Sequence, residues 1–519
     1  MSKAEPAATP SPAEGPLPIQ LSGFGLAIAA MTLAFANFMV VLDTTIANVS
    51  VPHIAGSLGI SPSQGVWVIT SYAVAEACCV PLTGWLAQRF GTVRTFIVCM
   101  LGFTAFSVLC GLSSSLTMLV AARIGQGLFG GPIMPLSQTL LLRIFPKEKA
   151  GAAMGIWSTT TVLAPVFGPI LGGVISDNVS WHWIFFINVP VGLMVAFGAS
   201  RTVRFAETAT RKLRIDSVGL ILMVLWIGAL QLILDLGRER DWFGSGLIVE
   251  LAVAVVIGFA LFLAWELTEK EPVVNLRLFR HRGFTASVVV ISIGFATFFA
   301  SVVLTPMWLQ ASQGYTATLA GLATAPIGIG SFIMSPIVAR LMAKHDLRAL
   351  ACFGLLWMAG ASLMRTYWTS ESDFVTIAMP QFVQGFGLPF FFIPLTTLAL
   401  ASVEPTEIAS AAGVMSFLRT MGGAIGASLG TTLLYDQATV ARSEMVSKLQ
   451  PAQTQGALEG IGFSLDQVRL AVANVVDKEA LAMATGHLFF LAASIFAVAA
   501  ATIWMAPRPT GNVAPGAAH

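Results

Sequence analysis

Apolar segments of about 20 residues recur along the whole of this 519-residue chain, and this repetition limits the folds open to it. A helix of that length crosses the hydrocarbon core of a bilayer. Charged residues make up only 10% of the chain, against roughly 25% in soluble domains. We therefore predict an all-α polytopic membrane protein with fourteen spans, near 23–46, 64–86, 93–112, 116–142, 151–175, 182–200, 216–236, 246–268, 285–308, 318–342, 348–369, 376–400, 409–435 and 484–506.

The basic residues of the connections predict the orientation of these spans. An even number of spans places both termini on one side, and the connections on that side carry most of the arginines and lysines. The opposite connections hold little beyond Arg238 and Arg240. Both termini are therefore expected in the cytoplasm. The segments 1–20, with a disordered composition, and 507–519 are expected to be cytoplasmic tails, and 436–483 an external segment with one or two amphipathic helices.

The chain also repeats itself, which predicts two related halves. Gln126-Gly127 returns as Gln384-Gly385, and the helices that follow each pair match without a gap. The repeat defines an N-terminal six-helix half at 21–203 and a C-terminal one at 284–506, with two inserted transmembrane helices at 204–283. Paired six-helix halves with a site at their interface are the architecture of alternating-access transporters. The repeats differ at one charge, because Arg123 corresponds to Gln381.

Two charges at membrane depth are the first candidates for function. Asp43 lies near the outer end of the first span, and Arg123 lies about 10 Å below the outer end of the fourth. Two opposite charges at this depth could meet and couple protonation of Asp43 to helix motion. They could equally form a static ion pair that holds two spans together.

Two further charges each have a functional and a structural interpretation. Glu76 lies midway along the second span, one turn from Tyr72, which could hydrogen-bond it. It could carry a coupled proton, contact cationic substrate groups, or be a neutral carboxyl within the bundle. Arg419 lies in the thirteenth span, where it could attract anionic substrates or bind a carbonyl at a helix end.

The fifth span combines a flat face with two breaks in backbone hydrogen bonding. Ala164, Gly168 and Gly172 recur every four residues, a spacing that lets another helix approach closely. Pro165 and Pro169 fix a bend in the same stretch. We expect a helix from the second half to close on this face as an outer gate.

Polar and large apolar side chains at membrane depth are candidates to line a substrate cavity. An adaptable cavity is favoured by flexible and aromatic residues with a few polar groups. Interhelical bonding and core packing are the alternatives for each of them. The candidates are Asn37, Met39, Gln126, Trp157, Gln384 and Phe391, together with Arg419.

Several motifs resemble one family over all fourteen spans. They are LDTTIANVSVPHIA (42–55), GVWVITSY (65–72), PLTGWLAQRFGTVR (81–94), RIGQGLFGGPIMPLSQ (123–138), APVFGPILGG (164–173), WIFFINVPVG (183–192) and PQFVQGFGLPFFFIPLTT (380–397). The chain resembles the fourteen-span drug:proton antiporters of the major facilitator superfamily, of the EmrB/QacA type, and most of all the EmrB-type inner-membrane pumps. The resemblance implies a proton-driven exporter of hydrophobic drugs in which Asp43 and Arg123 couple proton movement to transport.

The resemblance also implies partners, and it has one departure. EmrB-type pumps are expected to work with a periplasmic adaptor of the EmrA type and an outer-membrane channel of the TolC type. The loop between the second and third spans is implied in conformational gating, through Gly84, Arg89, Gly91 and Arg94. This loop usually carries an acid where Gln88 stands, so a latch built on that acid must be absent or made differently.

Other classes of protein are not indicated. The chain has no GxxxxGK motif, so transport would be driven by an ion gradient and not by an ATPase site. Its five cysteines lie in apolar runs and its six histidines are scattered, so we expect no metal, no cofactor and no enzymatic site. Two functions stay open beside multidrug export: export of a single metabolite or toxin, and a membrane sensor that transports nothing.

Overall fold

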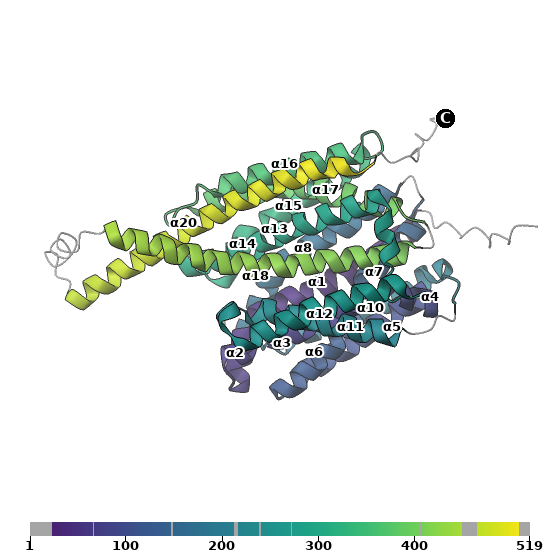
Figure 1. The fold of residues 1–519 in the computed structure, drawn as a ribbon, viewed down its shortest axis with the longest axis horizontal. Coiled ribbons are helices and arrows are strands. Elements are labelled where there is room, and N and C mark those ends of the chain that lie inside the picture. The colour runs from purple at the N-terminus through teal and green to yellow at the C-terminus, as the bar shows by residue number, and fades with distance from the viewer. Residues whose placement is uncertain are drawn as a thin grey trace, which may run out of the picture.

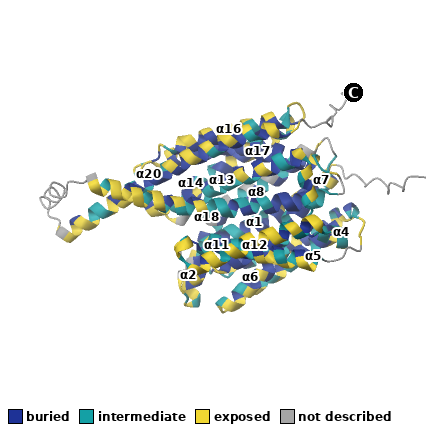
Figure 2. Cartoon of the chain, viewed as in Figure 1, coloured by how far each residue is buried: buried dark blue, intermediate teal, exposed yellow. Residues whose placement is uncertain are grey.

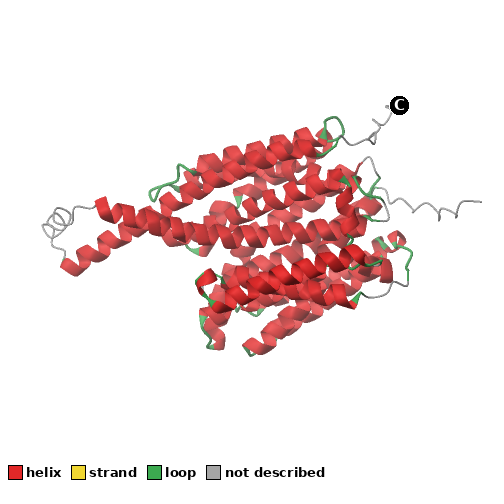
Figure 3. Cartoon of the chain, viewed as in Figure 1, coloured by secondary structure: helices red, strands yellow, loops and turns green. Residues whose placement is uncertain are grey.

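Helices form all the regular structure of the described chain, as Figure 3 shows. The computed structural model describes residues 23–507 apart from 66, 147–148, 212–215, 238–239, 271, 405–406 and 449–463. The first half contains α1 (Phe24–Leu58), α2 (Pro62–Gly65), α3 (Trp67–Cys79), α4 (Thr83–Phe90), α5 (Thr92–Gly111), α6 (Leu116–Gly130), α7 (Ile133–Ile144), α8 (Ala150–Asn178), α9 (Trp183–Phe186) and α10 (Asn188–Thr202).

Two inserted helices and the second half follow. The inserted helices are α11 (Ser217–Leu236) and α12 (Gly246–Thr268). A short 3₁₀ helix, η4 (Leu276–Arg280), leads from them into the second half. That half contains α13 (Arg282–Ser312), α14 (Ala317–Thr324), α15 (Pro326–Leu341), α16 (Leu347–Arg365), α17 (Phe374–Ala401), α18 (Ile408–Lys448) and α20 (Leu465–Thr502).

The expected spans are present, but some are broken. Eleven helical segments of the described chain are long and apolar enough to cross a membrane. The second span is divided into α3 and α4, and the fourth into α6 and α7 at a turn that contains Pro132. Proline has no N–H to donate, so a helix is easily interrupted there. The fifth span is the 29-residue helix α8, which continues through Pro165 and Pro169.

The two halves lie side by side, and the inserted helices cover one side of the boundary between them (Figure 1). Helix α11 packs against α12, against α3 of the first half and against α18 of the second. Helix α8 faces α1 within its own half, and α14, α15 and α17 in the other. Helices α8 and α18 are therefore the main elements along which one half meets the other.

Burial follows the helix faces, with exposed apolar residues on the outside of the bundle (Figure 2). Helix α12 is the clearest case, because Val253, Val256 and Ile257 are each more than half exposed. Such a surface would be unfavourable in water and is suited to lipid. The polar exceptions inside the bundle are therefore the residues to explain.

The segment expected to be external differs from the expectation of separate amphipathic helices. Helix α18 runs for 41 residues and α20 for 38, so each helix continues past the bundle without a break. Their outer parts project together beyond the other helices (Figure 1). An ion pair of 2.6 Å between Arg442 Nε and Asp477 Oδ1 joins them. We call the outer parts of α18 and α20, residues 436–448 and 465–483, the stalk.

Candidate functional site: a buried carboxylate held by five helices

Asp43 of α1 and Arg123 of α6 form a buried ion pair, as the sequence led us to expect. The Nη1 atom of Arg123 lies 2.6 Å from Oδ2 of Asp43. The two residues are only 2% and 1% exposed. Helix α6 is capped by Ser115, whose hydroxyl accepts a hydrogen bond from the Met118 amide, and Arg123 points inward two turns later.

The remaining donors around this pair are also used. Gln126 and Asn188 donate their side-chain amides to Oδ1 of Asp43, at 3.0 and 2.6 Å. Arg123 donates Nε to the carbonyl of Val68 at 3.0 Å, and its guanidinium carbon lies 4.2 Å from the ring centre of Tyr72. Charge-assisted hydrogen bonds of this kind are about twice as strong as neutral ones.

Ser107 completes the cluster from α5. Its hydroxyl accepts from Gln126 at 3.3 Å and from Asn188 at 3.0 Å, and donates to the Phe185 carbonyl at 2.9 Å. Helices α1, α3, α5, α6 and α10 thus contribute to one hydrogen-bonded cluster around the Asp43 carboxylate. If Asp43 took up a proton, Arg123 would lose its counter-charge, and the change would be felt in five helices at once.

Sequence reasoning found part of this cluster. It predicted Asp43 and Arg123, and it placed Gln126 among substrate contacts, whereas the Gln126 side chain is fully buried in the cluster. It missed Asn188 and Ser107. Asn188 stands out in hindsight as a polar residue within the apolar stretch WIFFINVPVG.

The second half contains a related cluster that has an arginine but no acid. Arg365, at the end of α16, is fully buried and donates to the side-chain oxygens of Gln381, at 2.7 Å, and Gln384. These glutamines are the repeat counterparts of Arg123 and Gln126. Among the described residues, no carboxylate pairs with Arg365. Sequence reasoning missed Arg365, because an arginine at the end of a span resembles an interfacial anchor.

Arg419 of α18 lies in an apolar cage made by both halves. Its guanidinium carbon lies 5.1 Å from the ring centre of Trp157, 5.5 Å from Phe295 and 6.0 Å from Phe392, and it contacts the sulfur of Met134. It is 2% exposed, and its Nε has no hydrogen-bond partner among the described residues. A caged cation of this kind gains from the ring quadrupoles, and within the described chain no carboxylate forms an ion pair with it.

Glu76 is half-buried on α3 and interacts electrostatically with both Arg123 and Arg419. The expected hydrogen bond from Tyr72 is absent, because within the described chain the Tyr72 hydroxyl has no partner and its ring lies against Arg123. Glu76 therefore interacts with the Asp43–Arg123 cluster of the first half and with Arg419 of the second half.

The other residues expected to line a cavity pack between helices in this structure. Asn37 donates to Thr160 and Thr161 on α8, at 2.9 and 2.7 Å. The Trp157 indole donates to the Ser137 hydroxyl at 3.0 Å. Met39 and Phe391 are at most 1% exposed and belong to apolar clusters.

The small-residue face of α8 packs against a different partner from the one expected. A Cβ on Gly168 would lie 2.6 Å from Cβ of Thr45, and one on Gly172 would lie 3.1 Å from the carbonyl oxygen of Ile46. Both contacts are with α1 of the same half, so the expectation of a helix from the second half was wrong. The second half meets α8 elsewhere, as where Gly321 of α14 approaches Ile170.

The loop between the second and third spans has two separate contacts. Gly84 packs on Ser410 of α18, because a Cβ on Gly84 would lie 2.7 Å from Cα of Ser410. Gly91 has a φ of +92° and precedes α5, whose first amides, those of Val93 and Arg94, bind the Glu207 carboxylate. Arg94 itself is exposed, and Arg89 is half-buried.

Two repeated six-helix halves, the first of which encloses a buried ion pair, define a secondary membrane transporter rather than an enzyme. The family model of the Major Facilitator Superfamily matches residues 33–427. The chain belongs to that superfamily, and the expectation of its fold and of its EmrB-type relationship is confirmed.

Close relatives and a solved structure agree with this assignment. The chain is 44% identical to the multidrug export protein EmrB of Escherichia coli (strain K12), over 95% of this chain and 97% of that protein. It is 41% identical to the fatty acid resistance protein FarB of Neisseria gonorrhoeae, over 94% and 97%. The human organic anion transporter MFSD10 (TETRAN) shares the fold at 12% identity, with a TM-score of 0.55 over 91% of this chain and 99% of that one.

Proposed function

We propose that this chain is a proton-driven antiporter that exports hydrophobic drugs across the bacterial inner membrane by alternating access. The observation that carries the proposal is the carboxylate of Asp43, bound at once to Arg123, Gln126 and Asn188. It is a titratable group, and a change in its protonation would alter hydrogen bonds in a cluster to which five helices contribute. The relationship to EmrB supplies the class of substrate.

The coupling step follows from the geometry of this pair. With Asp43 ionised, its negative charge compensates the positive charge of Arg123, and this ion pair holds helices of the first half together. With Asp43 protonated, Arg123 needs a new counter-charge, and Glu76 is a further acid with which it interacts electrostatically. Release of the pair would loosen α1 against α6 and allow the first half to tilt relative to the second.

The test is efflux by an Asp43→Asn variant in an efflux-deficient host. The amide keeps hydrogen bonding but cannot titrate, so export driven by a pH gradient in vesicles should be lost while the protein stays folded. Asp177→Asn is the matched control, because Asp177 is an exposed acid on α8 near His53. Normal gradient-driven efflux by Asp43→Asn would make the pair purely structural and refute the mechanism.

The substrate path is proposed to pass the cage around Arg419. The cage joins Met134 and Trp157 of the first half to Phe295 and Phe392 of the second, so a molecule between the halves would meet aromatic rings and one cation. An Arg419→Gln variant should lose resistance to anionic amphipathic drugs more than to cationic ones. Equal loss for both classes would contradict this role.

Export of one class of amphipathic acids is a second candidate, and the relative named for fatty acid resistance together with the cation in the cage favours it. A susceptibility panel that spans cationic dyes, neutral drugs and long-chain fatty acids separates the candidates. Protection against fatty acids alone would select the narrow exporter.

We propose that both termini are cytoplasmic and that the stalk faces the periplasm. There it would bind an EmrA-type adaptor that leads to a TolC-type channel. A reporter fused at residue 460 should report the periplasm, and a cytoplasmic signal would overturn this topology. A photoreactive cross-linker at exposed Ser443 should capture the adaptor, whereas one at Leu112, exposed at the outer end of α5, should not.

A further inference from the structure

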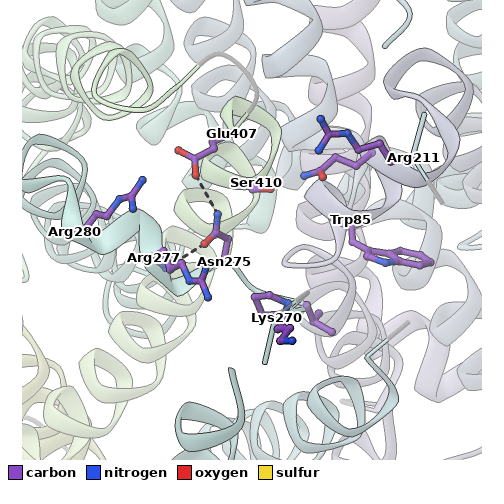
Figure 4. A pocket seen from close by; sticks show the side chains of 11 residues that line it. Trp85, Arg211, Lys270, Asn275, Arg277, Arg280, Glu407 and Ser410 are labelled. Carbon is purple, nitrogen blue, oxygen red and sulfur yellow. Dashed lines mark hydrogen bonds between the residues drawn. The ribbon is translucent and has the colours of Figure 1, made fainter. Parts of the chain in front are cut away.

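A pocket at the inner end of the molecule gathers basic side chains from both halves. It has a volume of about 360 Å³ and lies where α4, the linker after α12, η4 and the start of α18 meet. Figure 4 shows Arg211 on one side, Arg280 on the other, and Lys270 and Arg277 below them. Within the described chain, none of these four cations has an ion pair.

The pocket walls are held in place by the backbone and by close packing. The Arg211 amide donates to the Gln88 carbonyl at 2.9 Å, which ties this segment to α4 of the first half. Arg277 and Arg280 belong to η4, which is capped by Asn275 and leads into the second half. The pocket therefore lies across the boundary between the halves, next to the contact of Gly84 with Ser410.

Charge in the pocket is not balanced from within. Among the described residues that line it, the one acid is Glu407, which accepts a hydrogen bond from the Asn275 amide at 3.3 Å and lies 3.9 Å from His281. Gln88 contributes a neutral amide where an acid would have offset the cations. Four cations against one acid in the described lining give the cavity a positive potential.

We propose that this pocket binds a phosphate-bearing anion that bridges the two halves at their inner ends. Arginine and lysine around a cavity are typical of phosphate recognition, and the Ser410 hydroxyl and the first turn of α18 add hydrogen-bond donors. The anion can come from a phospholipid headgroup of the adjacent leaflet or from phosphate in solution. Trp85 also lines the pocket, and tryptophan is enriched at headgroup level, which favours the lipid.

Occupancy of the pocket would act on the transport cycle. Arg211 moves with the first half, and Arg277 and Arg280 move with the second, so an anion bound by both keeps the inner ends together. Separation of the halves at this end would divide the pocket and release the anion. The phosphate would serve as a removable electrostatic link that favours the state with a closed inner side.

Binding can be measured on the purified full chain without any transport. Thermal stability in detergent is followed while phosphatidylglycerol, phosphatidylcholine or inorganic phosphate is added, and bound lipid is counted by native mass spectrometry. The test variant is Arg277→Gln/Arg280→Gln. The control is Arg204→Gln/Arg340→Gln, which removes the same charge from exposed sites that do not line the pocket.

The wild type and the control should bind phosphatidylglycerol in preference to phosphatidylcholine. The test variant should bind it roughly 30-fold more weakly, because each basic side chain beside an anionic headgroup contributes about fivefold in affinity. The same pattern with inorganic phosphate would support the site and assign it to soluble phosphate. Equal binding of both anions by the test variant and the control would overturn the proposal, and both variants must elute as single symmetric peaks for the comparison.

Discussion

The contact between Gly168 and Thr45 makes a graded prediction about α8. A Cβ at Gly168 would overlap the Thr45 side chain, at 2.6 Å from its Cβ and 3.1 Å from its carbonyl carbon. A methyl group at Gly172 would come to 3.1 Å from the Ile46 carbonyl oxygen. At the adjacent Gly173, the nearest atom would be Oγ1 of Thr318 at 3.6 Å, an ordinary contact.

Alanine at these three glycines should therefore have very different effects. Gly168→Ala forces α1 and α8 apart and should destabilise the protein by about 3 kcal/mol, the upper part of the range for overpacking. Gly172→Ala should cost about 1 kcal/mol, and Gly173→Ala close to nothing, since alanine is also the better helix former. Gly168→Val should lose drug resistance altogether.

The assay is thermal unfolding of each purified variant together with drug resistance in an efflux-deficient host. A Thr45→Gly change removes the atoms that a new methyl group would meet, so it should restore part of the stability of Gly168→Ala. If Gly168→Ala is as stable as Gly173→Ala, then the close approach of α1 to α8 does not exist in the protein, and the reasoning fails.

Four further substitutions test the buried charges and their hydrogen-bond donors. Asn188→Ala removes one donor from Asp43 and should destabilise the protein by about 1–3 kcal/mol, measured by thermal unfolding, and an unchanged midpoint would remove Asn188 from the cluster. Arg365→Met removes an arginine that has no carboxylate partner in the described chain, so the stability of the protein should be kept or raised and gradient-driven efflux in vesicles retained. Arg123→Met, by contrast, should abolish that efflux. Glu76→Gln should leave the protein folded and reduce proton-coupled efflux in the same vesicles, and full efflux would show that Glu76 carries no coupled proton.

The order of spans and the repeat could be predicted because a bilayer admits few solutions for 20 apolar residues. Asp43 and Arg123 could be predicted for the same reason, since a charge at that depth requires a partner. Asn188 could not, because a neutral amide in an apolar helix is compatible with many roles. Its importance depends on which carboxylate it faces, and that is set by how α10 packs against α1.

Helix contacts were the least predictable feature. The face formed by Ala164, Gly168 and Gly172 predicts a closely packed helix. The spacing along one helix does not indicate which helix that neighbour is. The continuation of α18 and α20 into the stalk was also not predicted from the sequence. Polar residues after 435 suggested that the spans end there, whereas α18 and α20 support each other outside the bundle and so need no lipid.

Continuity between the stalk and the second half gives the stalk a lever action. The 41 residues of helix α18 make it about 60 Å long, and it runs from beside the inner pocket at Ser410 through Arg442 in the stalk, so it behaves as one rod. A tilt of about 10° in the second half would carry the outer end of that rod through roughly 10 Å. A protein seated on the stalk would thus be displaced at every turnover, and its load would in turn resist the tilt. Drug export by this chain would then slow when its outer partner is held rigid, even though that partner touches neither the drug nor the proton.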